Sequence, residues 1–460
     1  MKKTSTITGI KALTLALIAM IIPFINSCTK EKTDVTDLLS TVPSSSGGVI
    51  GINLSSILEK AGCNIDGAQI KPGKELEKWL ASRPDDSKDG IAALLNGDTG
   101  IDPMGAIVFN DAGRFFLTFS LADPDRFCAY IGNKSHIPFS TEGDVKVAGM
   151  VAVRGSQAWI CLTPGRMIDP HAISAYASLN KSQSFLENKF SEDIANMSDD
   201  IIGWGQIKTL IKGYMSFGEL SAFNMVTGML FEDATALSFK LDFKKGECES
   251  SLVILNDKGK PAKYLLPSDK IDDDVLKTLG ETCKGMAAFT VTPKLVDKLA
   301  KLGSSLGGSL LGDLKEYLKN VDGTVGVVLG DNPAANSNTP MNCVITTKGP
   351  VSLELKSFLA EWLGPVKEDG KYLRASSGDV NGPLSVLECA DELDGALMGA
   401  VLDYNKLAES SGIAPSKTFK SFIFKLEPES DGVELEFKLN SFNEKENILL
   451  SLIKENNLNL

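Results

Sequence analysis

The chain has few of the residues that build catalytic and metal centres. It contains two histidines, and none of its eight cysteines forms a Cys-x-x-Cys pair. A zinc ribbon and a dithiol redox motif are therefore excluded. Beyond residue 28 no run of about 18 apolar residues occurs, although a membrane-spanning helix needs roughly that length. After its N-terminal segment the chain is therefore expected to be soluble.

Basic residues are also in the minority. Of the 47 lysines and arginines, three (Lys2, Lys3 and Lys11) lie in the first 27 residues, so the remaining chain has 44 against 59 acidic residues, a net charge of −15. A surface of this sign repels phosphate backbones. Nucleic-acid binding is therefore not expected.

The N-terminal segment is typical of an export signal. The three lysines precede or begin an uncharged apolar stretch at residues 12–27, which is too short to span a bilayer comfortably but matches the apolar region of a signal peptide. We therefore predict that residues 1–27 form a signal peptide that is removed.

The residues at the end of this segment predict a lipid anchor. Ile25-Asn26-Ser27-Cys28 resembles a bacterial lipobox, in which the cysteine receives a diacylglycerol group, becomes the new N-terminus and is then acylated, for example with palmitate. Several acyl chains give durable membrane attachment. Cys28 is thus the predicted lipid attachment site; the alternative is an ordinary secretory signal with an incidental cysteine.

The other seven cysteines are far apart and mostly lie in apolar runs, which favours buried small hydrophobic residues. One disulfide stays open as an alternative in an oxidising compartment. The seven are Cys63, Cys128, Cys161, Cys248, Cys283, Cys343 and Cys389.

Two halves of the chain repeat the same patterns. A short apolar strand followed by a helix is predicted at residues 49–62, 201–213, 286–303 and 397–412. Hairpins follow at 236–257 and 421–441, and each contains Phe-Lys-Leu followed by an acidic residue. Period-two alternation in hairpins, with helices between them, indicates α+β architecture with a largely antiparallel sheet.

We therefore predict two divergent tandem copies, each an antiparallel sheet with helices packed on it. The expected boundaries are a polar tether at 28–41, a first α+β lobe at 42–265, a connector at 266–278, and a second α+β lobe with a C-terminal helix at 279–460.

The order of these features resembles a family of envelope lipoproteins of unknown function from Bacteroides-type bacteria. The likeness rests on Cys28, the polar tether, Val42-Pro43 and the stretch at 49–62, in which Ile52-Asn53-Leu54 and Lys60-Ala61-Gly62 are the most similar. It extends over nearly the whole chain. The resemblance implies an outer-membrane lipoprotein and no assigned activity.

Three patterns that suggest catalysis or ligand binding have simpler interpretations. Gly303-Ser304-Ser305-Leu306-Gly307 matches the serine-hydrolase elbow, but residues 293–302 before it have helical periodicity and no histidine follows it. The glycines after it lack the Gly-Lys-Ser/Thr ending of a phosphate loop. His136 and His171 have no partners at metal-ligand spacing, so we expect them at the surface or at helix starts.

Acidic clusters and tryptophans are the remaining candidates. The clusters at 197–200 and 269–274 contain oxygen ligands that calcium prefers, but they lack EF-hand spacing, so we expect solvated helix starts. Trp79 and Trp362 lie at helical spacing with leucines, which favours burial in the core over a sugar-stacking surface.

Taken together, the sequence predicts a non-enzymatic, lipid-anchored binding protein of the cell envelope, with the membrane and an unknown protein or glycan as partners. We expect no catalytic residues, no cofactor and no metal site. The alternatives are a glycan-directed envelope hydrolase that uses a carboxylate pair, which can meet only in the fold, and a structural spacer.

Overall fold

The computed structural model divides the chain into two compact units, each described here by itself. Unit 1 comprises Met1–Tyr214, Ala236–Cys248 and Asn443–Leu460, and unit 2 comprises Met215–Thr235 and Glu249–Phe442. The structure describes residues 33–66, 69–82, 94–95, 97–212, 227–266, 269–280, 282–305, 314–330, 340–380, 382, 384–410, 412 and 414–458.

Unit 1 is built on an antiparallel sheet with the strand order β14-β12-β2-β5-β6-β10-β9-β8-β7. Its core includes Phe119, Phe127 and Val153. Two short ladders, β1–β11 and β3–β4, lie outside this sheet. The strands are β1 (Thr33–Asp34), β2 (Gly48–Ile52), β3 (Asn64–Asp66), β4 (Gln69–Lys71), β5 (Ile101–Asp111), β6 (Arg114–Leu121), β7 (Ser140–Glu142), β8 (Val145–Ala148), β9 (Val151–Arg154), β10 (Gln157–Cys161), β11 (Asn196–Met197), β12 (Ile201–Gln206) and β14 (Ala236–Phe243).

Polar side chains begin several helices of unit 1. The Asn53 side chain accepts a hydrogen bond from the Ser56 N–H at the start of α3. Asp123 does the same for Arg126 at the start of α6, where Pro124 occupies the first turn. The helices are α2 (Thr36–Ser40), α3 (Leu54–Glu59), α4 (Lys74–Ala81), α6 (Pro124–Ser135), α7 (Pro170–Tyr176), η1 (Lys181–Gln183), η2 (Phe185–Glu187), α8 (Ser191–Ala195), α9 (Ile207–Lys212) and α17 (Ile448–Leu458).

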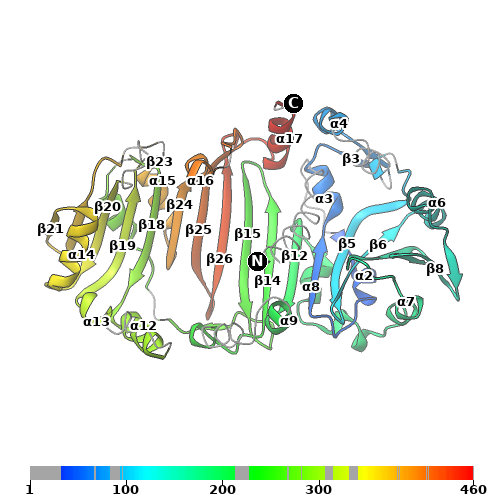
Figure 1. Ribbon diagram of the computed structural model, residues 1–460, viewed down its shortest axis with the longest axis horizontal. Coiled ribbons are helices and arrows are strands. Elements are labelled where there is room, and N and C mark those ends of the chain that lie inside the picture. The colour runs from blue at the N-terminus through cyan, green and yellow to red at the C-terminus, as the bar shows by residue number, and fades with distance from the viewer. Residues whose placement is uncertain are drawn as a thin grey trace, which may run out of the picture. The chain divides into compact units, whose positions relative to one another are not determined.

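Unit 2 is also built on an antiparallel sheet, with the order β15-β26-β25-β24-β18-β19-β20-β22-β21; Figure 1 shows β18 between β19 and β24. The short ladders β13–β16 and β17–β23 accompany it. The strands are β13 (Phe231–Glu232), β15 (Glu247–Leu255), β16 (Lys263–Tyr264), β17 (Thr282–Cys283), β18 (Gly285–Val291), β19 (Val321–Leu329), β20 (Met341–Thr347), β21 (Val366–Asp369), β22 (Tyr372–Ser376), β23 (Leu384–Ser385), β24 (Met398–Asp403), β25 (Phe419–Glu429) and β26 (Gly432–Ser441).

Helices cover both faces of the β20 region of this sheet. Because side chains alternate along a strand, Cys343 and Ile345 pack in one apolar cluster and Val344 in another. The first cluster includes the buried leucines of α14, and the second includes those of α11 and α15. The helices of unit 2 are α11 (Asp273–Lys277), α12 (Pro293–Ser305), α13 (Leu314–Tyr317), α14 (Leu353–Leu363), α15 (Val386–Leu393) and α16 (Tyr404–Ser410).

These elements confirm the predicted α+β class with a largely antiparallel sheet. The two units also share a strand order: β12-β2-β5-β6 in unit 1 corresponds to β24-β18-β19-β20 in unit 2, and a helix follows β2 and β18 alike. The strands that correspond are those with matching sequence patterns. An origin by duplication stays a prediction.

The predicted tether at 28–41 is too long. From Thr33 onward the chain is folded, because β1 pairs with β11 and α2 buries Leu38 and Leu39. The segment was predicted to be a tether because most of its residues are polar, although it contains these two leucines. Cys28 and the predicted signal peptide lie outside the described residues.

The predicted boundaries of both lobes also need correction. The first lobe was expected at 42–265, but Met215–Thr235 and residues 249–265 belong to unit 2. The connector at 266–278 contains α11, whose Val275 and Leu276 are fully buried in the core of unit 2. The C-terminal helix α17 belongs to unit 1, where it lies beside α4 (Figure 1) and Asn457 Nδ2 donates to the Glu75 carbonyl over 2.9 Å. Its apolar residues Ile448 and Ile453 are buried in unit 1.

Candidate functional site

Unit 1 contains a buried ion cluster. Lys60 Nζ lies 2.7 Å from Asp200 Oδ2 and 2.5 Å from Asp242 Oδ1. The Asp200 side chain is fully buried and that of Asp242 is 5% exposed, whereas Lys60 retains 15% exposure. Solvent therefore reaches the cluster mainly through the lysine.

Three elements position these side chains. Lys60 follows the last turn of α3, Asp200 precedes β12, and Asp242 lies near the end of β14. Ser56, one helical turn before Lys60, donates its hydroxyl to Asp200 Oδ1 over 2.6 Å. The Phe243 N–H donates to the other oxygen, Asp200 Oδ2, over 2.7 Å. Both carboxylate oxygens of Asp200 are thus occupied.

Burial and hydrogen bonding act in opposite directions on Asp200. Burial raises the pKa of its carboxyl group, whereas the Lys60 ammonium, the Ser56 hydroxyl and the Phe243 N–H lower it. The effect of burial is the larger, so the resulting pKa is about 6. A raised pKa next to a second carboxylate is also what an acid–base pair requires. Here, however, one ammonium group bridges the two acids, so neither carboxylate is open to a substrate. The arrangement is that of a structural ion cluster.

This cluster was not predicted from the sequence, and one of its members was misplaced. Asp200 lies in the acidic stretch at 197–200, which we expected to be a solvated helix start, but it is buried and precedes a strand. Asp242 ends the Phe-Lys-Leu-Asp motif, and Lys60 lies in the stretch that carries the family resemblance. Those two patterns were the available signals, but neither indicated that the three side chains meet.

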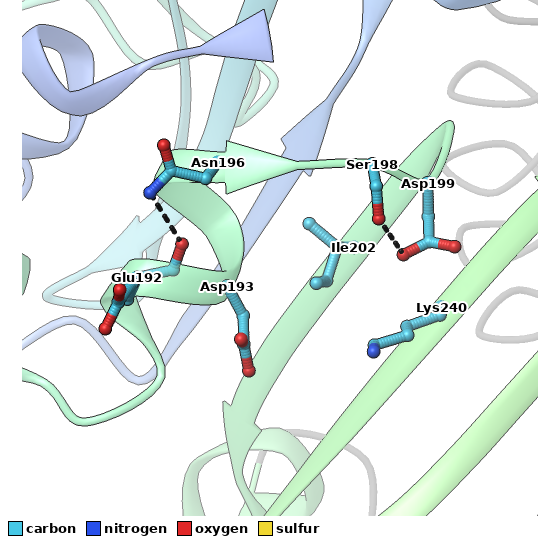
Figure 2. A pocket seen from close by; sticks show the side chains of 7 residues that line it. All are labelled: Glu192, Asp193, Asn196, Ser198, Asp199, Ile202 and Lys240. Atoms are coloured by element: carbon cyan, nitrogen blue, oxygen red, sulfur yellow. Dashed lines mark hydrogen bonds between the residues drawn. The ribbon is translucent and has the colours of Figure 1, made fainter. Parts of the chain in front are cut away.

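A polar pocket of about 470 Å³ lies nearby in unit 1 (Figure 2). Figure 2 shows the side chains of Asp193, Asp199 and Lys240 around it. Ser198 Oγ donates to Asp199 Oδ2 over 3.4 Å, and Asn196 Nδ2 donates to the Glu192 carbonyl over the same distance. Ile202 completes the lining. The pocket adjoins β11 and therefore lies close to β1, the first described strand.

The other candidate residues are mostly placed as predicted. His136 and His171 are exposed, at the end of α6 and in the first turn of α7.

The stretch before Gly303 is the helix α12, so the strand that a hydrolase elbow needs is not there; Leu306 and Gly307 lie outside the described residues. Asp272, Asp273 and Asp274 have oxygens within 4.8 Å of one another and lie at the start of α11.

The two tryptophans have different environments. Trp79 is 5% exposed, as predicted, but Trp362 is 63% exposed, so the prediction of burial was wrong there. Leu355, Leu359 and Leu363 form the buried stripe of α14. At about 100° per residue Trp362 falls at the edge of this stripe, where its ring is left exposed. Phe358 lies beside it with 51% exposure, and the two ring centroids are 6.1 Å apart.

The cysteines are also largely as expected. Five of the seven described cysteines are buried, and Cys128 and Cys248 are partly buried. Among the described residues, no helix has both the length and the apolar composition to cross a membrane.

Comparisons with known proteins add no functional assignment. No family model matches the chain, and no curated protein matches it. Among solved structures, crystal form I of TP0453 is similar over 77% of this chain and 95% of its own, with 10% identity and a TM-score of 0.28. Crystal form IV of TP0453 is similar over 46% and 78%, with 13% identity and a TM-score of 0.29. At such TM-scores no conclusion about fold or function follows.

We expect Lys60→Met to destabilise unit 1 by about 3–5 kcal/mol, because the substitution leaves two buried carboxylates without a cation. Lys78→Met is the matched control, since Lys78 is 65% exposed and pairs with Glu75 on the same helix; it should cost less than about 1 kcal/mol. Urea unfolding measures both. A loss for Lys60→Met no larger than that of the control would contradict the ion cluster.

Asp200 should also make stability depend on pH. Since its pKa is raised from 3.8 to about 6 in the folded chain, the folded state holds the proton more tightly than the unfolded state. The free energy of unfolding that Asp200 contributes therefore falls by about 3 kcal/mol as pH rises from about 4 to about 6.

Asp200→Asn tests this dependence because it removes the titrating group. Urea unfolding at a series of pH values should show the native chain losing stability relative to the variant over that range, with a constant difference above about pH 7. Asp66→Asn, a change at an exposed acid of the same unit, is the control. A constant difference for Asp200→Asn from pH 4 to 7 would rule out the raised pKa.

Proposed function

We propose that the chain is a non-catalytic binding lipoprotein of the cell envelope, anchored in the outer membrane by lipid on Cys28. The observation that carries the proposal is the short distance in sequence between the lipobox cysteine and the fold, since β1 begins at Thr33. Five residues of extended chain span at most about 17 Å. A lipid on Cys28 would therefore hold the β1–β11 edge of unit 1 close to the bilayer surface.

The ion cluster supports a non-catalytic role. A carboxylate-based hydrolase needs two acids that face a substrate, whereas Asp200 and Asp242 share Lys60 and are closed to solvent. Among the described residues, the histidines and the serine motif likewise do not form a nucleophile–base pair. These observations favour binding over the hydrolase alternative.

The exposed aromatic pair on α14 is the surface that we propose for binding. Phe358 and Trp362, one helical turn apart, are 51% and 63% exposed, and they lie beside the buried leucine stripe of the helix. Exposed apolar groups of this kind mark interaction sites when they cluster. Paired aromatic rings suit the apolar faces of sugar rings, which they can contact by stacking, so we propose a glycan as the ligand.

The anchor is tested with Cys28→Ala. In cells fed a labelled fatty acid, the native chain should carry the label, and its N-terminal peptide should begin at a diacylglyceryl Cys28. The variant should lose the label. Cys128→Ala, which changes a partly buried cysteine of unit 1, should retain it.

An unmodified Cys28 in the mature protein, or label that persists in Cys28→Ala, would refute the lipid anchor. Protease added to intact cells then distinguishes the two sides of the outer membrane. Cleavage of the native chain from outside would direct the ligand search to extracellular glycans, and protection would direct it to the periplasm.

The binding surface is tested with Trp362→Ala. The native chain should be retained on peptidoglycan sacculi or on immobilised mucin glycans, and the variant should lose at least tenfold in affinity, which corresponds to about 1.4 kcal/mol. Leu387→Ala, which changes a 51% exposed residue on α15 of the same unit, is the matched control and should bind as the native chain does. Retention on neither glycan, or equal retention of Trp362→Ala, would overturn the glycan proposal.

A further inference from the structure

Two cysteine sulfurs meet in the core of unit 2. Cys283 Sγ and Cys389 Sγ are 3.4 Å apart, and the residues are 0% and 1% exposed. The backbone around them is closely linked: β17 pairs with β23, so that Cys283 lies opposite Leu384, and α15, which contains Cys389, begins directly after β23. Their proximity therefore follows from a strand ladder and from the helix that continues it.

The separation is short enough for a covalent bond. An S–S bond is about 2.05 Å long, so the two sulfurs need to approach by about 1.4 Å, which small rotations of the side chains can provide. A zinc site is a poorer interpretation because it needs four ligands. Within the described part of the chain, the side chains that lie close enough together to share a metal ion are Asp272, Asp273 and Asp274. Neither cysteine belongs to this group.

In the packed unit the two thiols also differ in acidity. A hydrogen bond from the Cys389 thiol lowers the pKa of the Cys283 thiol, against the effect of burial, which raises it. Cys343 differs, because burial alone raises the pKa of its thiol to about 12.

We propose that Cys283 and Cys389 form an intramolecular disulfide that ties β17 to α15 as the chain folds. While both sulfurs are still accessible, the thiolate of one cysteine attacks one sulfur of an oxidant disulfide, such as oxidised glutathione, and displaces its other sulfur as a thiolate. The second cysteine, after losing its proton to solvent, attacks the sulfur of the first and displaces the second thiolate. Two thiols thus lose two protons and two electrons, and the oxidant disulfide is reduced to two thiols.

Burial determines when this reaction occurs. An oxidant cannot reach either sulfur once β17 and α15 are packed, so the bond forms while these elements dock. In the cell the oxidant is met outside the cytoplasm, and to that extent the inference rests on the export assumed in the proposed function. The bond closes a loop that contains β18 to β22, and a long loop restricts the unfolded chain more than a short one.

Refolding tests the bond independently of export. The full-length chain is unfolded in urea with dithiothreitol, refolded in oxidised and reduced glutathione, alkylated in denaturant and digested without reductant. Mass spectrometry should find the peptides of Cys283 and Cys389 linked and two hydrogen atoms lighter, with Cys343 alkylated. Free Cys283 and Cys389 thiols in the refolded chain, or links to other cysteines with equal frequency, would overturn the proposal.

Variants separate the bond from effects on folding. Cys343→Ser should retain the Cys283–Cys389 link, and Cys389→Ser should leave Cys283 alkylated. The urea midpoint of the refolded native chain should fall when dithiothreitol is added, and that of Cys389→Ser should not change. Equal effects of dithiothreitol on both would count against the bond. Because the redox buffer supplies the oxidant, a failed lipid-labelling experiment leaves this result unaffected.

Discussion

An ammonium group held between two buried carboxylates joins three distant parts of unit 1. Lys60 is separated by 140 residues from Asp200 and by 182 from Asp242. A buried charge is tolerated only when its partners are in place. Unit 1 therefore cannot reach its final state until the segment Ala236–Cys248, which follows residues assigned to unit 2, has returned to it. The cluster makes the folding of unit 1 depend on a chain that leaves the unit and comes back.

Unit 2 uses the same sequence motif with a different outcome. Phe-Lys-Leu-acid recurs in β25, where Lys425 pairs with Glu427 over 2.9 Å and with Glu436 of β26 over 3.3 Å. The Glu427 side chain is 33% exposed, against 5% for Asp242. The motif thus places an acidic side chain near the end of a strand in both units. In unit 1 that acid is buried against Lys60, which follows α3, whereas in unit 2 it is partly exposed.

The sequence was sufficient for the elements that local chemistry determines. The strand-then-helix pattern at 49–62 could be predicted because periodicity acts within a few residues. The meeting of Lys60, Asp200 and Asp242 could not, because nothing local records which distant segments become neighbours. For the same reason Trp362 was misplaced: its spacing is helical, but α14 has one covered face, and leucines already fill it.

The boundaries of the tether, the connector and the C-terminal helix were mispredicted for the same reason, because local composition does not record which segments pack together. Polar composition suggested a tether before residue 42 and a connector at 266–278, yet each segment contains three buried apolar residues and is part of a core: Val35, Leu38 and Leu39 in the first, and Ile271, Val275 and Leu276 in the second. The C-terminal helix α17 was assigned to the lobe that precedes it in sequence, but its apolar face is covered by α4 from the other end of the chain.

The β1–β11 ladder determines how unit 1 responds to mechanical load. Within the described residues Thr33 and Asp34 pair with β11, and the Val35 N–H donates to the Ala195 carbonyl over 3.0 Å. The next buried residues are Val35, Leu38 and Leu39. A pulling force applied at Thr33 would act on these hydrogen bonds before it reached the packed leucines of α2, and release of the two paired residues would lengthen the free chain by about 7 Å.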